Sequence, residues 1–192
     1  MLEALMRRPE SFGPAQLEPM RAAGHDRVAI EDAVAVGAMF ACILRVADSL
    51  GFAYPNSITQ EMAARYLLGK GYGPSPGELV GARRYAKLWG DLQQAVENTP
   101  GHTEPELRKQ VYAWIERDAR KADAELSELP NDLHTLIRKG SRNAYQISDE
   151  DIAALLAKGW RDGAVFEVVV AMATSAGATR HAIAMDAIDL SE

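Results

Sequence analysis

Apolar side chains recur every three or four residues along almost the whole chain, which is the spacing of amphipathic helices. No pair of alternating apolar runs around a tight turn indicates a β-hairpin. The run Val165–Met172 resembles a strand, but Asp162 before it and the alanine-rich sequence after it favour a long buried helix. The pattern predicts one all-α domain over residues 1–192, with helices at about 14–23, 27–50, 58–69, 76–98, 104–127, 131–144, 149–158 and 163–188.

Capping residues and glycines mark the expected helix boundaries. Ser148 precedes Asp151 by three residues, the spacing of a capping box, in which the two side chains satisfy backbone amides at a helix start. Similar spacings begin at Ser57, Ser75 and Thr103. Glycine tolerates the left-handed conformation that often ends a helix, so helix ends are predicted at Gly24, Gly51, Gly71 and Gly159.

The two ends of the chain resemble each other at an offset of 135 residues. Residues 12–24 align without a gap with residues 147–159, and both segments end in glycine. A short helix, a glycine and a long helix with small residues therefore occur twice, which predicts an internal duplication with repeat units at about 12–50 and 147–188. Identical pairs in the long helices are Ala29 with Ala164, Val34 with Val169, Ala38 with Ala173, Ala41 with Ala176, and Arg45 with Arg180.

The paired arginines, Arg45 and Arg180, have two interpretations. Each could support the carbonyl-rich end of a helix electrostatically. Alternatively, packing of the two units around a pseudo-twofold axis would make the arginines line a pocket together. Glu31 and Glu167 lie early in the long helices, where they are either exposed acids or buried carboxylates that need an arginine partner.

Composition excludes several classes of partner. The net charge of −6 and the pI near 5.3 leave no basic surface for nucleic acid or an anionic membrane, and the pair Arg7-Arg8 is expected to be solvated. The longest uncharged apolar runs fall short of the roughly 20 residues that span a bilayer. The first residues carry several charges and do not resemble a signal peptide. We therefore expect a cytoplasmic protein that has neither a membrane nor nucleic acid as partner.

Cysteine and histidine offer little chemistry. Cys42, the single cysteine, lies within a predicted helix, so we expect a buried thiol with a raised pKa rather than a nucleophile. A glycine-rich segment at residues 69–77 lacks the P-loop pattern and is predicted to be a loop. The histidines do not have the spacing of a metal site, so no metal or cofactor is expected; they are His25, His102, His134 and His181.

Two stretches resemble a known family. Ala33–Phe52 is similar to the long helix of the alkylhydroperoxidase AhpD-like and carboxymuconolactone decarboxylase superfamily, although Ala41 and Leu44 replace its usual asparagines. Asn143–Ala173 is similar to the short-helix and long-helix segment of the same family. The resemblance implies an AhpD-like helical fold and a homo-oligomer. Residues that agree in the first stretch are Phe40, Arg45, Ala47, Asp48, Leu50 and Gly51.

The peroxidase chemistry of that family does not carry over. Its peroxidase branch implies a C-x-x-C pair followed by a histidine, because one thiolate attacks the peroxide and the second resolves the sulfenic acid. No residue at the corresponding places has a side chain that could substitute, which argues against alkylhydroperoxidase or other antioxidant activity. These places are Ala144, Ile147 and Asp151 in the second unit and Pro9, Phe12 and Gln16 in the first.

Two hypotheses of function follow. The first is an AhpD-like protein without the redox cysteines, which binds a small molecule between its long helices or serves as a structural scaffold. The alternative is a cofactor-independent enzyme of the carboxymuconolactone decarboxylase type, in which a carboxylate acts as general acid or base beside an arginine that clamps an anion. Candidate residues for that chemistry are Glu31, Asp48 and Asp151 with Arg45 and Arg180.

Overall fold

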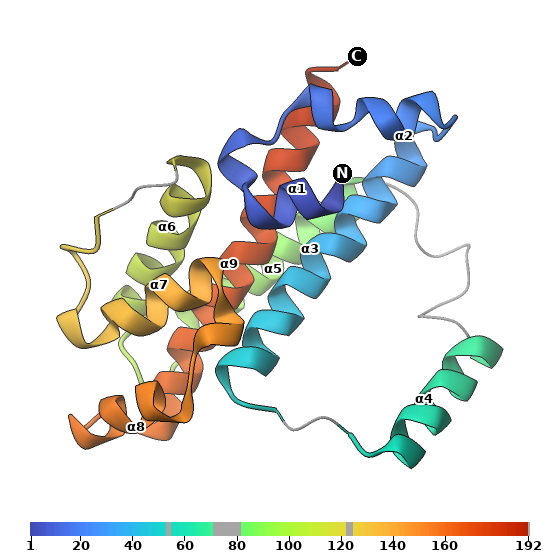
Figure 1. Cartoon of the computed structure of the whole chain (residues 1–192). Helices are drawn as coiled ribbons and strands as arrows, with labels where there is room; N and C mark the ends of the chain where they lie inside the picture. The colour runs from blue at the N-terminus through green and yellow to red at the C-terminus, as the bar shows by residue number, and fades with distance from the viewer. Residues whose placement is uncertain (53–54, 71–81, 122–124, 192) are drawn as a thin grey trace.

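The computed structural model describes residues 1–52, 55–70, 82–121 and 125–191. All regular structure in these ranges is helical, which confirms the predicted all-α class. Figure 1 shows the arrangement of the helices. The elements are α1 (Leu2–Arg7), η1 (Pro9–Ser11), η2 (Pro14–Gln16), α2 (Glu18–Ala22), α3 (Arg27–Ser49), α4 (Ser57–Lys70), α5 (Ala82–Asn98), α6 (Pro105–Lys121), η3 (Asn131–Leu133), α7 (His134–Arg142), η4 (Ala144–Gln146), α8 (Asp149–Ala157) and α9 (Asp162–Asp189).

The long helix α9 is the centre of the fold, and α3 packs along it (Figure 1). The strand-like run at residues 165–172 lies inside α9, as the flanking sequence predicted. Small residues allow the two helices to approach closely. An added Cβ at Gly177 would lie 2.8 Å from the backbone oxygen of Ala38 and 2.6 Å from a ring carbon of Trp89 on α5. The close crossing of α3, α5 and α9 therefore depends on a residue without a side chain at position 177.

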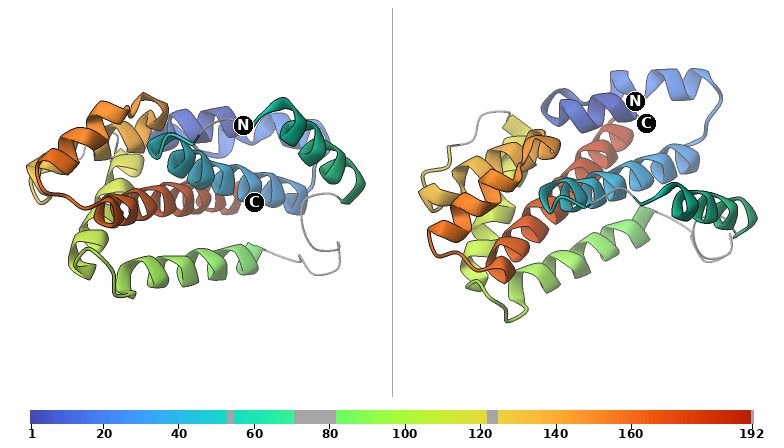
Figure 2. Two further views of the ribbon diagram at one scale, coloured as in Figure 1. Left: turned by 90° about the horizontal axis from the view of Figure 1, so that it is seen from below. Right: turned by 60° about the horizontal axis from the view of Figure 1, so that its bottom comes forward.

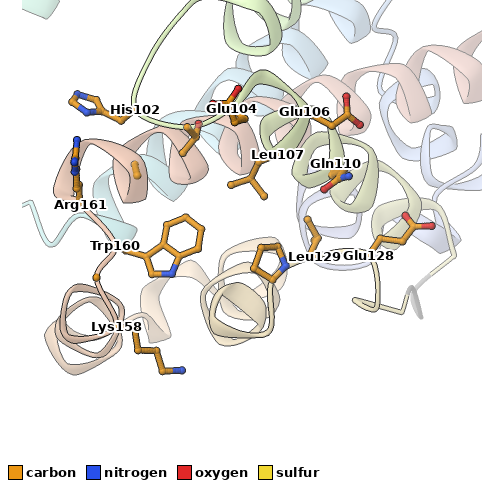
Figure 3. A pocket seen from close by; sticks show the side chains of 14 residues that line it. His102, Glu104, Glu106, Leu107, Gln110, Glu128, Leu129, Lys158, Trp160 and Arg161 are labelled. Atoms are coloured by element: carbon orange, nitrogen blue, oxygen red, sulfur yellow. The ribbon is translucent and has the colours of Figure 1, made fainter.

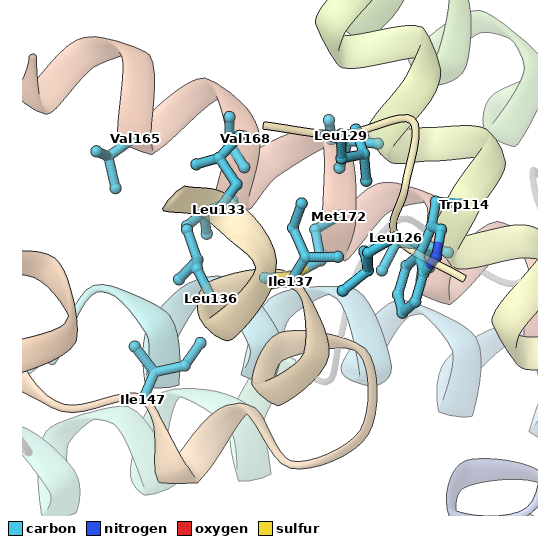
Figure 4. Close-up of a cluster of buried hydrophobic side chains, with 14 of the residues drawn as sticks. Trp114, Leu126, Leu129, Leu133, Leu136, Ile137, Ile147, Val165, Val168 and Met172 are labelled. Carbon is cyan, nitrogen blue, oxygen red and sulfur yellow. The ribbon is translucent and has the colours of Figure 1, made fainter. Parts of the chain in front are cut away.

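Helices α6, α7 and α8 cover one side of α9, and α5 lies on another (Figure 2). The side chains between α6, α7 and α9 form the larger hydrophobic core, in which Trp114 stands at one edge and Ile147 at the other (Figure 4). The Nε1 atom of Trp114 donates to the carbonyl oxygen of Glu125, so its polar atom is satisfied. A second, smaller core lies under the N-terminal segment and contains Leu5, Leu17 and Ile188.

The backbone has equivalent features 135 residues apart. Arg8 has φ −139° and ψ 62°, and Asn143 has φ −139° and ψ 59°. A three-residue 3-10 turn follows each of them, η1 in the first case and η4 in the second. The glycines that precede the long helices have φ 85° at Gly24 and φ 95° at Gly159. A duplication accounts for these similarities, and its range would then begin with α1 and α7; the common origin of the two units stays a prediction.

Several boundaries differ from those predicted. Helix α1 was not predicted, although Leu2, Leu5 and Met6 have helical spacing. The helix predicted at 104–127 ends at Lys121, and the segment 125–130 runs without a helix. Of the predicted loop at 69–77 the first two residues belong to α4, and the remainder lies outside the described residues, as does the start of the helix predicted at 76–98.

Helix α4 stands away from the other helices (Figure 1). Every residue of α4 whose side chain is described is exposed. Isolated helices shorter than about 12–15 residues are marginal in water, so a helix of this length depends on packing for its stability.

A substitution at Gly177 tests the close crossing of the helices. Gly177→Ala should lower the free energy of unfolding by about 1–3 kcal/mol, because the added methyl group meets backbone and an aromatic ring. The measurement is urea denaturation followed by circular dichroism. The matched control is Gly90→Ala in α5, where an added Cβ meets nothing within 4 Å. The free energy of unfolding of this control should rise by about 0.5–1 kcal/mol. An equal rise in the free energy of unfolding of both variants would contradict the close approach of α3, α5 and α9 at Gly177.

Candidate functional site

Arg45 lies buried near the end of α3, with 9% of its surface exposed. Its Nη1 donates to the carbonyl oxygen of Ala41 at 2.9 Å, and its Nη2 donates to the carbonyl oxygen of Ser141 at 2.8 Å. The buried Nε has no hydrogen-bond partner in the described part of the chain. Arg45 therefore joins α3 to the last turn of α7 and keeps one unused donor.

Arg180 likewise joins its own helix, α9, to the last turn of α1. Its Nη1 donates to the carbonyl oxygen of Ala176 at 3.0 Å, and its Nη2 and Nε donate to the carbonyl oxygen of Met6 at 3.3 and 3.4 Å. The contacts are reciprocal, since each arginine binds the last turn of the helix that opens the other unit. The equivalent residues, 135 positions apart, are Arg45 and Arg180, Ala41 and Ala176, and Met6 and Ser141.

The two guanidinium groups make a buried positive centre. Burial and the nearby charge of Arg45 together lower the pKa of Arg180 to about 9, although Asp118 opposes the shift. Burial likewise lowers the pKa of Arg45 to about 10, with Asp48 among the groups that oppose the shift. Neither arginine forms a salt bridge with a carboxylate among the described residues. Buried charge of one sign is costly, so an anion near this centre is favoured.

In the second unit the protein supplies that anion itself. Asp118 of α6 is 5% exposed and accepts hydrogen bonds from the Ser141 hydroxyl at 2.7 Å and from Arg142 Nη2 and Nε at 2.8 and 3.3 Å. The space that remains beside Arg180 is only about 40 Å³, and Asp118 and Ala119 line it. Helix α6 therefore fills the place in front of Arg180 with a carboxylate.

In the first unit the equivalent place is an open groove of about 1150 Å³ between α1, α3 and η4. Arg45 lies at its inner side, and Arg7, the equivalent of Arg142, lies on its wall. Arg7 forms only an exposed ion pair with Glu3, at 3.3 Å. The groove thus contains the same pair of arginines as the second unit, without an aspartate equivalent to Asp118.

Apolar side chains also line the groove. Val36, Phe40 and Leu44 line it from α3, and they are 55%, 45% and 53% exposed. Asp48 lies farther along the same helix and also lines the groove. The groove therefore joins a buried cation to an exposed apolar surface.

Of the candidate residues that the sequence proposed, the structure places Arg45 near Arg180 in the buried positive centre and places Arg45 and Asp48 along one groove. Glu31 is buried and pairs with Arg27 at 2.6 Å rather than with Arg45 or Arg180. Asp151 lies at the start of α8, where it accepts from the Ser148 amide at 2.9 Å.

Asp151 is also held by Lys139, whose Nζ lies 2.5 Å from its carboxylate. Although partial burial opposes the shift, the hydrogen bonds from Lys139 and Ser148 hold the pKa of Asp151 below its ordinary value. The Asp151 carboxylate therefore stabilises a helix start, as the predicted capping box requires. The other acid that the sequence considered, Glu167, binds Arg108 and the Thr103 hydroxyl instead of Arg180.

Sequence reasoning missed Arg7 and Asp118. The pair Arg7-Arg8 was interpreted as a solvated helix face, yet extending the repeat alignment toward the N-terminus places Arg7 opposite Arg142. That identity was an available signal for Arg7. Asp118 has no equivalent in the first unit, so only the packing of α6 could reveal its position.

Burial raises the pKa of the Cys42 thiol, as the sequence predicted, while a hydrogen bond with Thr174 partly opposes the shift. A raised pKa leaves little thiolate at neutral pH, and thiolate is the reactive form. In the native protein Cys42 should therefore react with a disulfide reagent at least about tenfold more slowly than in urea. Equal rates at one pH would contradict a protected thiol.

A second hollow, of about 880 Å³, lies between the start of α6, the segment before η3 and the turn between α8 and α9. Figure 3 shows Trp160 within it, with Lys158 and Arg161 on one side and Glu106 and Glu128 on the other. Basic and acidic side chains thus lie on opposite sides of this hollow, and none of its polar side-chain atoms is both buried and without a partner among the described residues. It offers no site comparable to that at Arg45.

No helix in the described ranges combines the length and the apolar character needed to cross a bilayer. No protein-family model matches this chain, and neither a curated protein nor a solved structure matches it.

Removal of the internal carboxylate tests the buried positive centre. Asp118→Ala should lower the free energy of unfolding by about 2–3 kcal/mol, because it removes a buried carboxylate that accepts hydrogen bonds from Arg142 and offsets the charge of Arg180. Added sodium formate should restore part of the loss by binding in the vacated place, whereas sodium chloride at equal ionic strength should not. Thermal unfolding monitored by circular dichroism measures both effects.

Asp132→Ala is the control for this experiment, because Asp132 forms a pair with Lys158 at an exposed position. The free energy of unfolding of this variant should fall by no more than about 1 kcal/mol, and formate should not restore it more than sodium chloride does. Equal responses of the two variants to formate would contradict an anion-binding centre at Asp118.

Proposed function

We propose that this protein binds a small molecule with a carboxylate group and an apolar body in the groove between α1, α3 and η4. One observation carries the proposal: there are two equivalent arginine centres, and among the described residues a buried carboxylate lies in only one of them. The proposal keeps small-molecule binding from the hypothesis drawn from the sequence, a protein similar to the AhpD and carboxymuconolactone decarboxylase superfamily without its redox cysteines. It places the site beside α3 and not between the long helices, which approach closely at Gly177.

Asp118 indicates how the carboxylate would be bound. In the second unit Arg142 holds the aspartate through two nitrogen atoms, and Arg180 lies nearby. The equivalent cations in the first unit are Arg7 and Arg45. A ligand carboxylate between them would offer an acceptor to the unpartnered Nε of Arg45. It would replace the exposed ion pair of Arg7, which is worth little in water.

The apolar wall suggests the remainder of the ligand. Val36, Phe40 and Leu44 would cover an aliphatic or aromatic body, and burial of apolar surface gives about 25 cal/mol per Å². The carboxylate would set the orientation, because it would contact the arginines while the apolar body contacts α3. Glu3 and Asp48 would disfavour a second negative charge on the ligand.

The enzyme hypothesis retains one pair of residues, because Asp48 and Arg45 line the same groove. In such an enzyme Asp48 would exchange a proton with a substrate that Arg45 holds. Asp48→Asn separates the hypotheses. A binding protein should keep or increase its affinity for a carboxylate after this change, since a like charge is removed, whereas an enzyme should lose its turnover.

The binding test uses decanoate and decanol, which share an alkyl chain and differ in charge. Isothermal titration calorimetry should detect binding of decanoate, and decanol should bind at least about tenfold more weakly, because a charge-assisted hydrogen bond contributes about 1.5 kcal/mol or more. Equal affinities for the two probes would show that the arginines do not recognise the ligand.

Arg7→Gln provides the residue-level test. Its side chain is 78% exposed, so the change should leave the fold intact while it weakens decanoate binding by about tenfold. The matched control is Arg117→Gln, which removes another exposed arginine paired with a glutamate, outside the groove. An unchanged affinity for decanoate in the Arg7 variant would contradict the proposed binding mode.

A further inference from the structure

The outward face of α3 is a broad apolar surface. Its side chains are large and about half exposed, and they follow the spacing of one helix face. Monomeric soluble proteins rarely expose contiguous apolar patches of more than a few hundred Å². This surface, the α3 face, consists of Val36, Met39, Phe40, Ile43 and Leu44.

The equivalent face of α9 is covered by α6. Helices α6 and α9 pack along each other, and the Ser175 hydroxyl donates to the carbonyl oxygen of Tyr112 at 2.7 Å. Four of the five residues of α9 equivalent to the α3 face are small and almost completely buried, whereas Ala178, the equivalent of Ile43, is partly exposed. The α3 face precedes α4 to α6 in the chain, and no described helix lies on it as α6 lies on α9. The equivalent buried residues are Ala171, Thr174, Ser175 and Thr179.

Helix α4 has the surface that such a covering helix needs. Ile58, Met62 and Tyr66 form a stripe at intervals of four residues, and they are 69%, 66% and 65% exposed. Glu61 and Arg65 pair with each other at 2.6 Å beside this stripe. The chain therefore presents two apolar helix faces, each without a partner among its own described residues.

We infer that α4 of a second copy of this chain packs on the α3 face, in the place that α6 occupies on α9. A second copy is favoured because α4 stands away from its own α3 (Figure 1) and because reciprocal exchange covers both faces in every copy. The exchanged helix would also border the groove, since Val36, Phe40 and Leu44 belong to both surfaces. The inference is argued from the two apolar faces and not from carboxylate binding, although α4 would contact the same three side chains as the apolar body of a bound ligand.

Light scattering coupled to size exclusion measures the assembly directly. The wild-type chain at micromolar concentration should have at least twice the 20.9 kDa mass of one copy. Met62→Glu with Tyr66→Glu on α4 should reduce the mass to that of one copy, and Ile43→Glu on α3 should do the same. These side chains are exposed, so circular dichroism should remain that of the folded protein.

Leu156→Glu is the control, because it places a charge at an exposed leucine on α8, away from both faces. Its mass should equal that of the wild type. A monomeric wild-type chain would overturn the inference. It would also be overturned if the α4 variant kept the wild-type mass, since α3 faces would then pair with each other.

Mixing the two monomeric variants tests the exchange itself. The chain with glutamates on α4 keeps an intact α3 face, and the chain with Ile43→Glu keeps an intact α4. One correct contact can therefore form between unlike chains, and the mixture should contain a species of two copies. A mixture that remains monomeric would overturn the inference, whereas loss of decanoate binding alone would bear only on the proposed function.

Discussion

The packing of this protein depends on a pair of reciprocal hydrogen bonds. Arg45 in the first long helix binds a carbonyl group in the last turn of α7, and Arg180 in the second long helix binds a carbonyl group in the last turn of α1. A cation at the C-terminal end of a helix is favourable, so each arginine stabilises the helix it reaches. These bonds fix the two ends of the chain against each other and bury two positive charges at the centre of the molecule.

The buried charge sets the chemistry of the site. Both arginines have lowered pKa values because they are desolvated, and among the described residues a buried carboxylate, that of Asp118, lies beside Arg180 but none lies beside Arg45. Helix α6 brings that carboxylate and also covers one face of α9. The first unit has neither the helix nor the carboxylate, and this single difference leaves a cationic groove and an apolar face side by side on α3.

The sequence was sufficient for the parts of the fold that local patterns determine. Helical periodicity identified the all-α class, and the capping box at Ser148 was placed correctly. The alignment of Arg45 with Arg180 located the site, because identical polar residues in two apolar helices are informative. Glu31 and Asp151 were weaker candidates, since local partners, Arg27 and Lys139, neutralise them. Asp118 could not be found, because its role depends on how α6 packs across sequence-distant helices.

The proposed binding mode requires that the Nε–H group of Arg45, which has no hydrogen-bond partner among the described residues, donates to a ligand carboxylate. Nuclear magnetic resonance of ¹⁵N-labelled protein observes this group directly, and its signal can be assigned through its absence in Arg45→Lys. Titration with decanoate should shift the Arg45 Nε–H resonance in proportion to occupancy, while decanol leaves it in place. A decanoate complex that leaves this resonance unchanged would contradict carboxylate binding at Arg45.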